Sequence, residues 1–150
     1  MGGSGNNLNN KKESAATATF FFLCLVFFAA VALDQASKAL VGTAEVFENH
    51  VFAFSLPVPV YLMYLIYAAV FIGMSYYVAC NHREFNFTAK LAWVLIFAGA
   101  ISNIGERVIL GYVRDWIYIW TGIFNLADGY IILGIILLLI QSYWQPKPSQ

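Results

Sequence analysis

Two aspartates in this sequence are placed so that they could do chemistry together. Asp115 lies in residues 111–120, which alternate between apolar and polar or aromatic side chains as a β-strand does. Its carboxylate shares an inward face with Val113, Ile117 and Ile119, on which it is the odd polar group, while Arg114 turns outward. Because an unpaired buried carboxylate is costly, it must find a partner or take a proton. Asp128, thirteen residues later, is the natural partner.

Two carboxylates that share one water can hydrolyse a peptide bond. Like charges so close together cannot both ionise easily, so one carboxyl stays protonated. The ionised one takes a proton from the water, which attacks the peptide carbonyl, while the protonated one polarises that carbonyl and later helps protonate the leaving nitrogen. We therefore predict that Asp115 and Asp128 lie within a few ångströms as an aspartic-protease dyad. Which of them carries the proton stays open.

The elements that must position this pair are four long apolar runs. Residues 15–33, 49–81, 91–105 and 129–145 contain no charged residue, and the chain is 61% hydrophobic and 11% charged. A spanning helix needs about 20 apolar residues, so the third run must continue past Glu106 and Arg107 to Leu110. We predict an all-α membrane protein of four transmembrane helices. Residues 15–145 would form one membrane domain, with a disordered cytoplasmic tail at 1–14 and a second cytoplasmic tail at 146–150.

The start of the chain also resembles a cleavable signal peptide. Lys11 and Lys12 precede an apolar stretch that ends in the small residues 30–32. Against cleavage, the uncharged segment continues for 19 residues to Leu33, which is long enough to span a membrane. We expect the segment to be retained as the first helix.

The distribution of lysine and arginine predicts the orientation in the membrane. With the N-terminus inside, five basic residues face the cytoplasm: Lys11, Lys12, Arg83, Lys90 and Lys147. Three face outward: Lys38, Arg107 and Arg114. Both termini are therefore expected in the cytoplasm.

The ionisable residues of three helices are expected at one depth. At about 1.5 Å per residue, Arg107 lies about 24 Å along its helix from Leu91, and Asp128 lies equally far from Trp144. Asp34 and Lys38, spaced i, i+4 on one helix face, end the first helix at the same outer level. Charged groups at such depth usually face a bundle interior or a water-filled cavity and belong to a functional site.

Several other kinds of function find no support in the composition. The formal net charge is zero and no basic patch is present, so nucleic acid is not an expected partner. The two cysteines, Cys24 and Cys80, and the two histidines, His50 and His82, stand alone without metal-ligand spacing. These residues therefore predict no metal site.

Four segments in order resemble the lipoprotein signal peptidase (signal peptidase II) family of bacterial membrane proteases, over residues 34–134. Residues 34–38, Asp-Gln-Ala-Ser-Lys, match its D-Q-x-S-K element, and Asn103 and Arg107 fall where its G-N-x-x-D-R element has Asn and Arg. Residues 113–116 resemble its V-x-D-F element, and residues 124–128, Phe-Asn-Leu-Ala-Asp, its F-N-x-A-D element. A weaker likeness, to N-x-G-x-A-F, begins at Asn49.

The resemblance implies roles for these residues and a substrate. Asp115 and Asp128 would be the catalytic dyad. Substrate-binding and supporting residues would be Asp34, Lys38, Asn49, Asn103, Arg107 and Asn125. The substrate would be a prolipoprotein with a diacylglyceryl group on its lipobox cysteine, cut just before that cysteine. Residues 43–56 and 111–123 would form a small extracytoplasmic β-cradle for lipid and peptide, with the site near the outer leaflet of the bacterial cytoplasmic (inner) membrane. The resemblance implies no metal and no organic cofactor. We also expect the protein to be a monomer surrounded by membrane lipids.

Three positions depart from the family pattern. Ser102 replaces a Gly, Glu106 replaces an Asp, and Val51 stands where Gly is usual. Losing that Gly restricts the backbone near the expected substrate groove. We expect activity to be retained, because both dyad positions are present, and substrate or inhibitor preference to change.

Two rival functions use the same residues differently. A small proton-coupled transporter would also carry intramembrane carboxylates, but its sites usually lie near the midplane between broken helices. A non-catalytic four-helix scaffold could be told from an active protease by sequence only if it lacked one of the two aspartates, and both are present here.

Overall fold

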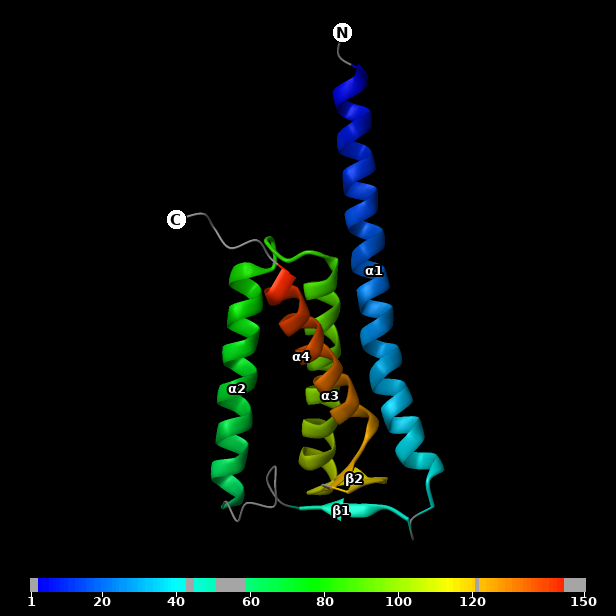
Figure 1. Ribbon diagram of the computed structural model, residues 1–150, viewed down its shortest axis with the longest axis vertical. Helices are drawn as coiled ribbons and strands as arrows, with labels where there is room; N and C mark the ends of the chain where they lie inside the picture. The colour runs from blue at the N-terminus through cyan, green and yellow to red at the C-terminus, as the bar shows by residue number, and fades with distance from the viewer. Residues whose placement is uncertain (1–2, 43–44, 51–58, 121, 145–150) are drawn as a thin grey trace.

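Four long helices run roughly along one direction in the computed structural model, which describes residues 3–42, 45–50, 59–120 and 122–144 (Figure 1). They are α1 (Gly3–Leu40), α2 (Val60–Asn81), α3 (Phe87–Leu110) and α4 (Leu126–Trp144). By length and composition all four can cross a membrane, α1 through its part Glu13–Leu40. The predicted four-helix membrane fold is confirmed.

One helix boundary differs from that expected from the sequence. Residues 3–14 are helical and form the first turns of α1, whereas we expected a disordered tail. Extending an existing helix is far easier than nucleating one, so the apolar span can extend as helix into its polar start. In the uncharged run 49–81, β1 ends at Asn49, within the predicted cradle segment, and α2 begins at Val60 after Pro59. Proline suits a helix start because no N–H is needed there.

Four short strands form two antiparallel pairs at one end of the bundle. They are β1 (Phe47–Asn49), β2 (Val113–Asp115), β3 (Ile117–Ile119) and β4 (Gly122–Phe124). β1 pairs with β2 and β3 with β4, so that Asp115 lies opposite Phe47. Both segments of the predicted β-cradle thus supply strands. Residues 43–44, 51–58 and 121 lie outside the described part of the chain, and so does Val51, where the family pattern has Gly.

The predicted alternation along residues 111–120 is correct for β2 and wrong farther along. Val113 and Asp115 are buried and Arg114 is half-buried, as expected of a strand with one inner face. Ile119, expected on the inner face, is 55% exposed. Among the described strands β3 pairs only with β4.

Helix α3 is the centre of the bundle and packs closely against α4. Two glycines permit the close approach, one from each helix. A Cβ on Gly99 would meet the backbone of Ala127, and a Cβ on Gly134 would lie 2.6 Å from the carbonyl oxygen of Ala92. In membranes, where helices gain little from hydrophobic burial against each other, small residues at such crossings let backbones pack.

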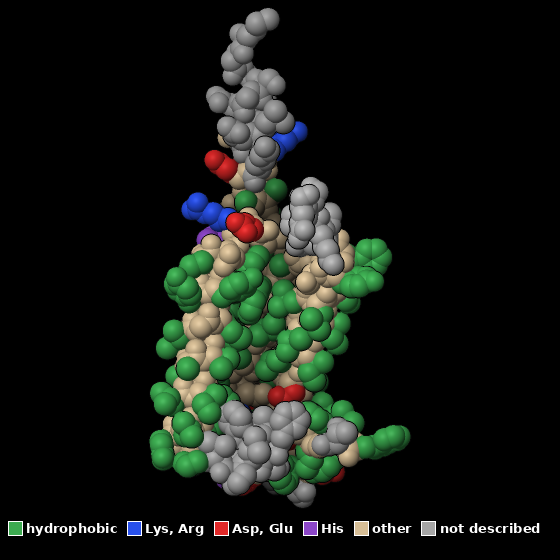
Figure 2. Space-filling model, turned by 60° about the vertical axis from the view of Figure 1, so that its left-hand side comes forward, with side chains coloured by type: hydrophobic (Ala, Val, Ile, Leu, Met, Phe, Trp, Pro, Cys, Tyr) green, Lys and Arg blue, Asp and Glu red, His purple; other side chains and the backbone are tan. Residues whose placement is uncertain are grey.

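Helix α2 meets the bundle through large aromatic side chains instead. The rings of Phe71 and Phe97 are 5.4 Å apart edge to face, and Tyr77 lies 5.7 Å from Trp93. Near the β-strands, the Tyr64 hydroxyl donates to the carbonyl oxygen of Arg107 at 2.7 Å. Figure 2 shows hydrophobic side chains over this face of the helices, with a hollow between them and acidic side chains at its lower rim.

Candidate active site

Asp115 is held on β2 by hydrogen bonds to both carboxylate oxygens. Helix α3 ends at Gly111, which has a left-handed conformation with φ of 83° that favours glycine because it has no Cβ atom. The chain then enters β2. The inward face of β2 leaves Asp115 2% exposed. Its Oδ1 accepts from the Asn125 side chain at 2.6 Å, and its Oδ2 accepts from Asn49 at 2.8 Å.

These surroundings perturb the ionisation of Asp115. Burial raises the pKa of its carboxyl above the ordinary value, and hydrogen bonds from Asn49 and Asn125 oppose that rise. The carboxyl of Asp128 is close enough to raise this pKa further by like-charge repulsion, while the Lys38 charge lowers it. The net effect is a raised pKa, which favours a proton on Asp115.

Asp128 lies in the first turn of α4 and is held by a reciprocal cap. The Asn125 side chain accepts from the Asp128 backbone N–H at 3.0 Å, and Asp128 Oδ2 accepts from the Asn125 backbone N–H at 3.1 Å. This is the geometry of a capping box, in which each residue satisfies the other's free donor. Asp128 Oδ1 accepts from Asn103 of α3 at 2.9 Å.

Asn125 connects the two aspartates. Besides its bonds to the Asp128 backbone and carboxylate, its Nδ2 donates to Asp115 and, at 3.1 Å, to Asn103 Oδ1. Each of the four oxygens of Asp115 and Asp128 therefore accepts one N–H. The structure brings together five of the predicted residues at this point: Asn49, Asn103, Asp115, Asn125 and Asp128.

Asp34 and Lys38 of α1 lie beside this group and bond to Asn103 and to the start of α4. Neither forms a described hydrogen bond with Asp115 or Asp128. The Lys38 ammonium is 1% exposed and contacts three oxygens, those of Asp34 at 2.7 Å, Glu106 at 3.0 Å and Asn103 at 3.2 Å. An ammonium has three donors, so it is saturated. Asp34 Oδ1 also accepts the backbone N–H of Ala127 at 2.9 Å, which ties α1 to the start of α4.

Arg107 lies at the edge of this group. Its guanidinium stands 5.3 Å over the ring of Tyr67 on α2, a cation–π contact. Its Nε is buried and has no hydrogen-bond partner among the described residues. Arg107 is therefore near the site, on the side toward α2, and does not bond to either aspartate in the described contacts.

The sequence reasoning missed four residues that complete the polar cluster. Ser102 donates to Asp34 at 2.6 Å and accepts from Gln35 at 2.8 Å. Arg114, expected to turn outward, instead lies against Glu106, and it also donates to Gln35 at 3.0 Å. One signal could have found two of them: Ser102 and Glu106 are spaced i, i+4, a stripe beside that of Asn103 and Arg107.

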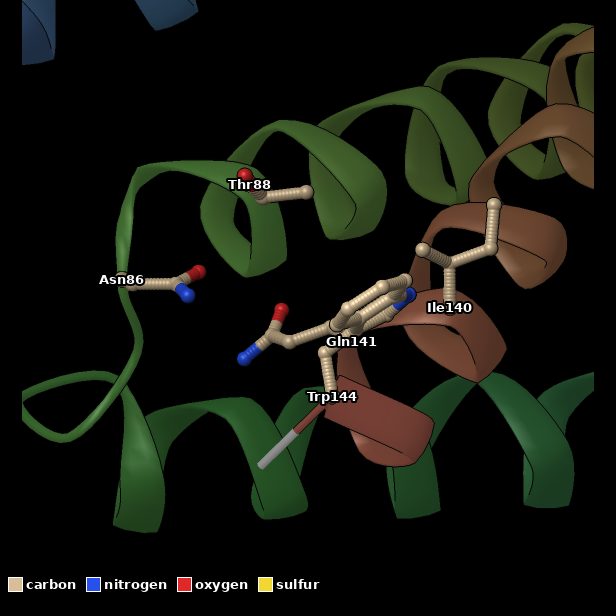
Figure 3. A pocket seen from close by; sticks show the side chains of 5 residues that line it. All are labelled: Asn86, Thr88, Ile140, Gln141 and Trp144. Carbon is tan, nitrogen blue, oxygen red and sulfur yellow. The ribbon is translucent and has the colours of Figure 1, made fainter. Parts of the chain in front are cut away.

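A cavity of about 290 Å³ lies at the other end of α3 and α4, away from the aspartates. There Gln141 points from α4 toward Asn86 at the start of α3 (Figure 3). Because none of the predicted residues lines it, this cavity is not part of the site.

Fold and site together define a multi-pass membrane protein with a buried polar cluster at one end of its helical bundle. The family model described as "Signal peptidase (SPase) II" matches residues 26–144. A lipoprotein signal peptidase of Streptococcus pyogenes serotype M1 is 33% identical over 129 residues, covering 73% of this chain and 85% of the relative. One from Fusobacterium nucleatum is 35% identical over 80 residues, covering 51% and 48%.

Two solved structures of a bacterial membrane enzyme, obtained by the in meso method, share the fold. One at 2.3 Å resolution has a TM-score of 0.67, with 23% identity, and covers 86% of this chain and 94% of its own. The other, at 1.9 Å, has a TM-score of 0.69 and covers 83% and 94%. The chain belongs to the signal peptidase II family. It is therefore a multi-pass membrane protease, and the suspected resemblance is confirmed.

Proposed function

We propose that this chain is an aspartic endopeptidase that removes the signal peptide from diacylglyceryl-modified prolipoproteins, cutting before the lipidated cysteine. The observation that carries the proposal is the link through Asn125 between Asp115 and Asp128. Family membership supports the lipoprotein substrate, because the curated relatives are lipoprotein signal peptidases.

In the proposed reaction Asp115 is the protonated member and Asp128 the ionised one. For the first assignment, Asp115 lies on β2, outside the helices, and burial raises the pKa of its carboxyl. For the second, Asp128 sits in the first turn of α4, where the helix dipole and the N-cap N–H stabilise negative charge.

The proton transfers then balance over one cycle. Asp128 takes a proton from the water molecule while the water oxygen bonds to the scissile carbonyl carbon. Asp115 gives its proton to the carbonyl oxygen. When the C–N bond breaks, Asp128 gives its proton to the leaving nitrogen, and Asp115 regains one from the tetrahedral intermediate. Both carboxyls return to their starting states.

We propose that the site faces the outer leaflet and that both termini are cytoplasmic. The distribution of lysine and arginine supports this orientation. The aspartates and the paired strands lie at one end of the bundle, away from the Gly3 end of α1 and the Trp144 end of α4 (Figure 1). We further propose that the monomer in lipid is active, since one chain supplies both aspartates and their described partners.

The test is cleavage of a lipid-modified prolipoprotein by the purified protein in detergent or vesicles. We expect the wild type to release the signal peptide and a folded Asp128→Asn variant to release almost none. Cleavage by Asp128→Asn at near the wild-type rate would contradict the dyad. Failure of the well-folded wild type to cleave would contradict the function, leaving a scaffold or transporter.

A further inference from the structure

Glu106 is the most heavily hydrogen-bonded carboxylate in the described part of the chain, and the mechanism above does not use it. It lies on α3 and is 4% exposed. Its Oε2 accepts from Lys38 at 3.0 Å and from the Arg114 backbone N–H at 3.1 Å. Its Oε1 accepts from Arg114 Nε at 2.7 Å and from Nη2 at 2.6 Å. One side chain thus joins α1 to β2.

Glu106 has a short path to each aspartate. It accepts hydrogen bonds from the backbone and the side chain of Arg114, the residue directly before Asp115. Through Lys38, it reaches Asn103, which donates to Asp128. A shift of Glu106 would therefore move both carboxylates, although it touches neither.

The charges around Glu106 balance. Asp34 and Glu106 face Lys38 and Arg114, and the uncharged Gln35 and Ser102 fill the remaining hydrogen bonds. Buried ion pairs add little net stability compared with apolar packing. Their geometry is demanding, however: two N–H groups of Arg114 converge on Glu106 Oε1, while Lys38 and the Arg114 backbone N–H bond to Oε2, so the carboxylate is held on both oxygens.

The side-chain length of Glu106 fits this bridging role. Where the family pattern has Asp, this chain has one more methylene, and the carboxylate reaches Lys38 of α1 and Arg114 of β2 together. We propose that Glu106, acting through Arg114 and Lys38, is a positioning residue that sets the geometry of Asp115 and Asp128. This inference rests on the proposed function of that pair.

The kinetic test compares Glu106→Gln, Arg114→Gln and the double variant in prolipoprotein cleavage. Each single variant should lower kcat by about 10- to 100-fold with KM within about twofold, because small misplacements of catalytic groups cost that much. The kcat of the double variant should be no lower than that of the less active single variant, as expected of residues that act together. Arg114→Lys, which keeps the charge but not the planar fork, should recover only part of the rate.

The matched control is Glu84→Gln in the turn between α2 and α3. Glu84 is exposed and lies at the opposite end of α3 from Glu106. It should keep wild-type kcat and KM.

A second readout does not depend on activity. The chain has three aspartates, Asp34, Asp115 and Asp128, so infrared spectra of protein with isotope-labelled aspartate can be assigned with the Asn variants. Glu106→Gln should shift the Asp115 and Asp128 carboxyl bands, whereas Glu84→Gln should not. If Glu106→Gln does not fold, Arg114→Gln, which removes the cation from the same ion pair, takes its place and should shift the same bands.

The outcomes separate the two proposals. An active wild type, with unshifted bands and a near wild-type kcat in folded Glu106 variants, overturns the positioning role alone. An inactive wild type overturns the proposed function, and the infrared bands still decide whether Glu106 sets the geometry of the aspartates.

Discussion

At the residue scale, Lys38 sets the donor and acceptor roles of Asn103 and Asn125 in their hydrogen bonds to the two aspartates of the pair. An ammonium can only donate, so Asn103 must present its oxygen to Lys38 and its NH₂ group to Asp128. The same oxygen of Asn103 accepts from Asn125, whose second N–H is then directed at Asp115. A buried cation that touches neither aspartate thus determines that both receive donors.

The first prediction concerns the two aspartates as a unit. Asp115→Asn, Asp128→Asn and the double variant should each lose at least about 1000-fold in kcat/KM, and by similar amounts, since residues that act together are not additive. Asn103→Ala and Arg107→Ala should cost less. Steady-state cleavage kinetics measure this, and unfolding in detergent checks that each variant is folded. Losses that multiply in the double variant would mean independent roles.

The second prediction concerns pH. If Asp115 must be protonated, activity falls as pH rises through its pKa, which sets the basic limb of the kcat/KM profile. Asn49 donates to the Asp115 carboxylate and lowers that pKa. Asn49→Ala should therefore raise the pKa and move the basic limb to higher pH, with a lower maximum rate. A basic limb that moves to lower pH would instead assign the required proton to another group.

At the element scale, the close crossing of α3 and α4 brings Asn103 within reach of Asp128 and Asn125. The two glycines leave no room for a methyl group at their contacts with Ala127 and Ala92. The reciprocal cap at the start of α4 and the turn at Gly111 then aim the two aspartates from neighbouring elements.

The third prediction tests that crossing. In Gly134→Ala the added Cβ would lie 2.6 Å from Ala92 O and from an Ile96 side-chain carbon, so the helices must separate. We expect a loss of about 1–3 kcal/mol in the free energy of unfolding. The matched control is Gly73→Ala on α2, where nothing lies within 4 Å of the new methyl group. Equal stability of the two variants in detergent would argue against the tight crossing.

At the scale of the whole molecule, the polar cluster lies at one end of a bundle whose outer surface is apolar. The exposed side chains along α1, α2 and α4 include many Phe, Leu, Ile and Val residues, as lipid contact requires. The side of the membrane on which the cluster lies decides which substrates it meets.

The fourth prediction fixes that side. In a chain with Cys24 and Cys80 replaced by Ser, a single cysteine at residue 85 should react with an impermeant thiol reagent only from the cytoplasm. A single cysteine at residue 48 should react only from outside. Labelling of intact cells and of inverted vesicles measures this. The opposite pattern would place the aspartates on the cytoplasmic side and remove the proposed function.

The four spans could be identified from the sequence alone, and so could the two aspartates that the structure links through Asn125. Span length is a local property, set by the match between an apolar run and the bilayer, so composition suffices to find it. Asp115 and Asp128 could be singled out because each interrupts a local pattern, an apolar strand face and an apolar helix.

Which polar groups contact one another depends on the packing of distant segments. Gln35 and Arg114 are separated by 79 positions, and Ser102 and Asp34 by 68. Their contacts depend on how each helix is rotated and how closely α3 and α4 approach, which no single segment encodes. The same holds for β1, which forms its only described pairing with the distant β2. Packing also turns Arg114 toward Glu106, since burying that carboxylate requires a cation beside it.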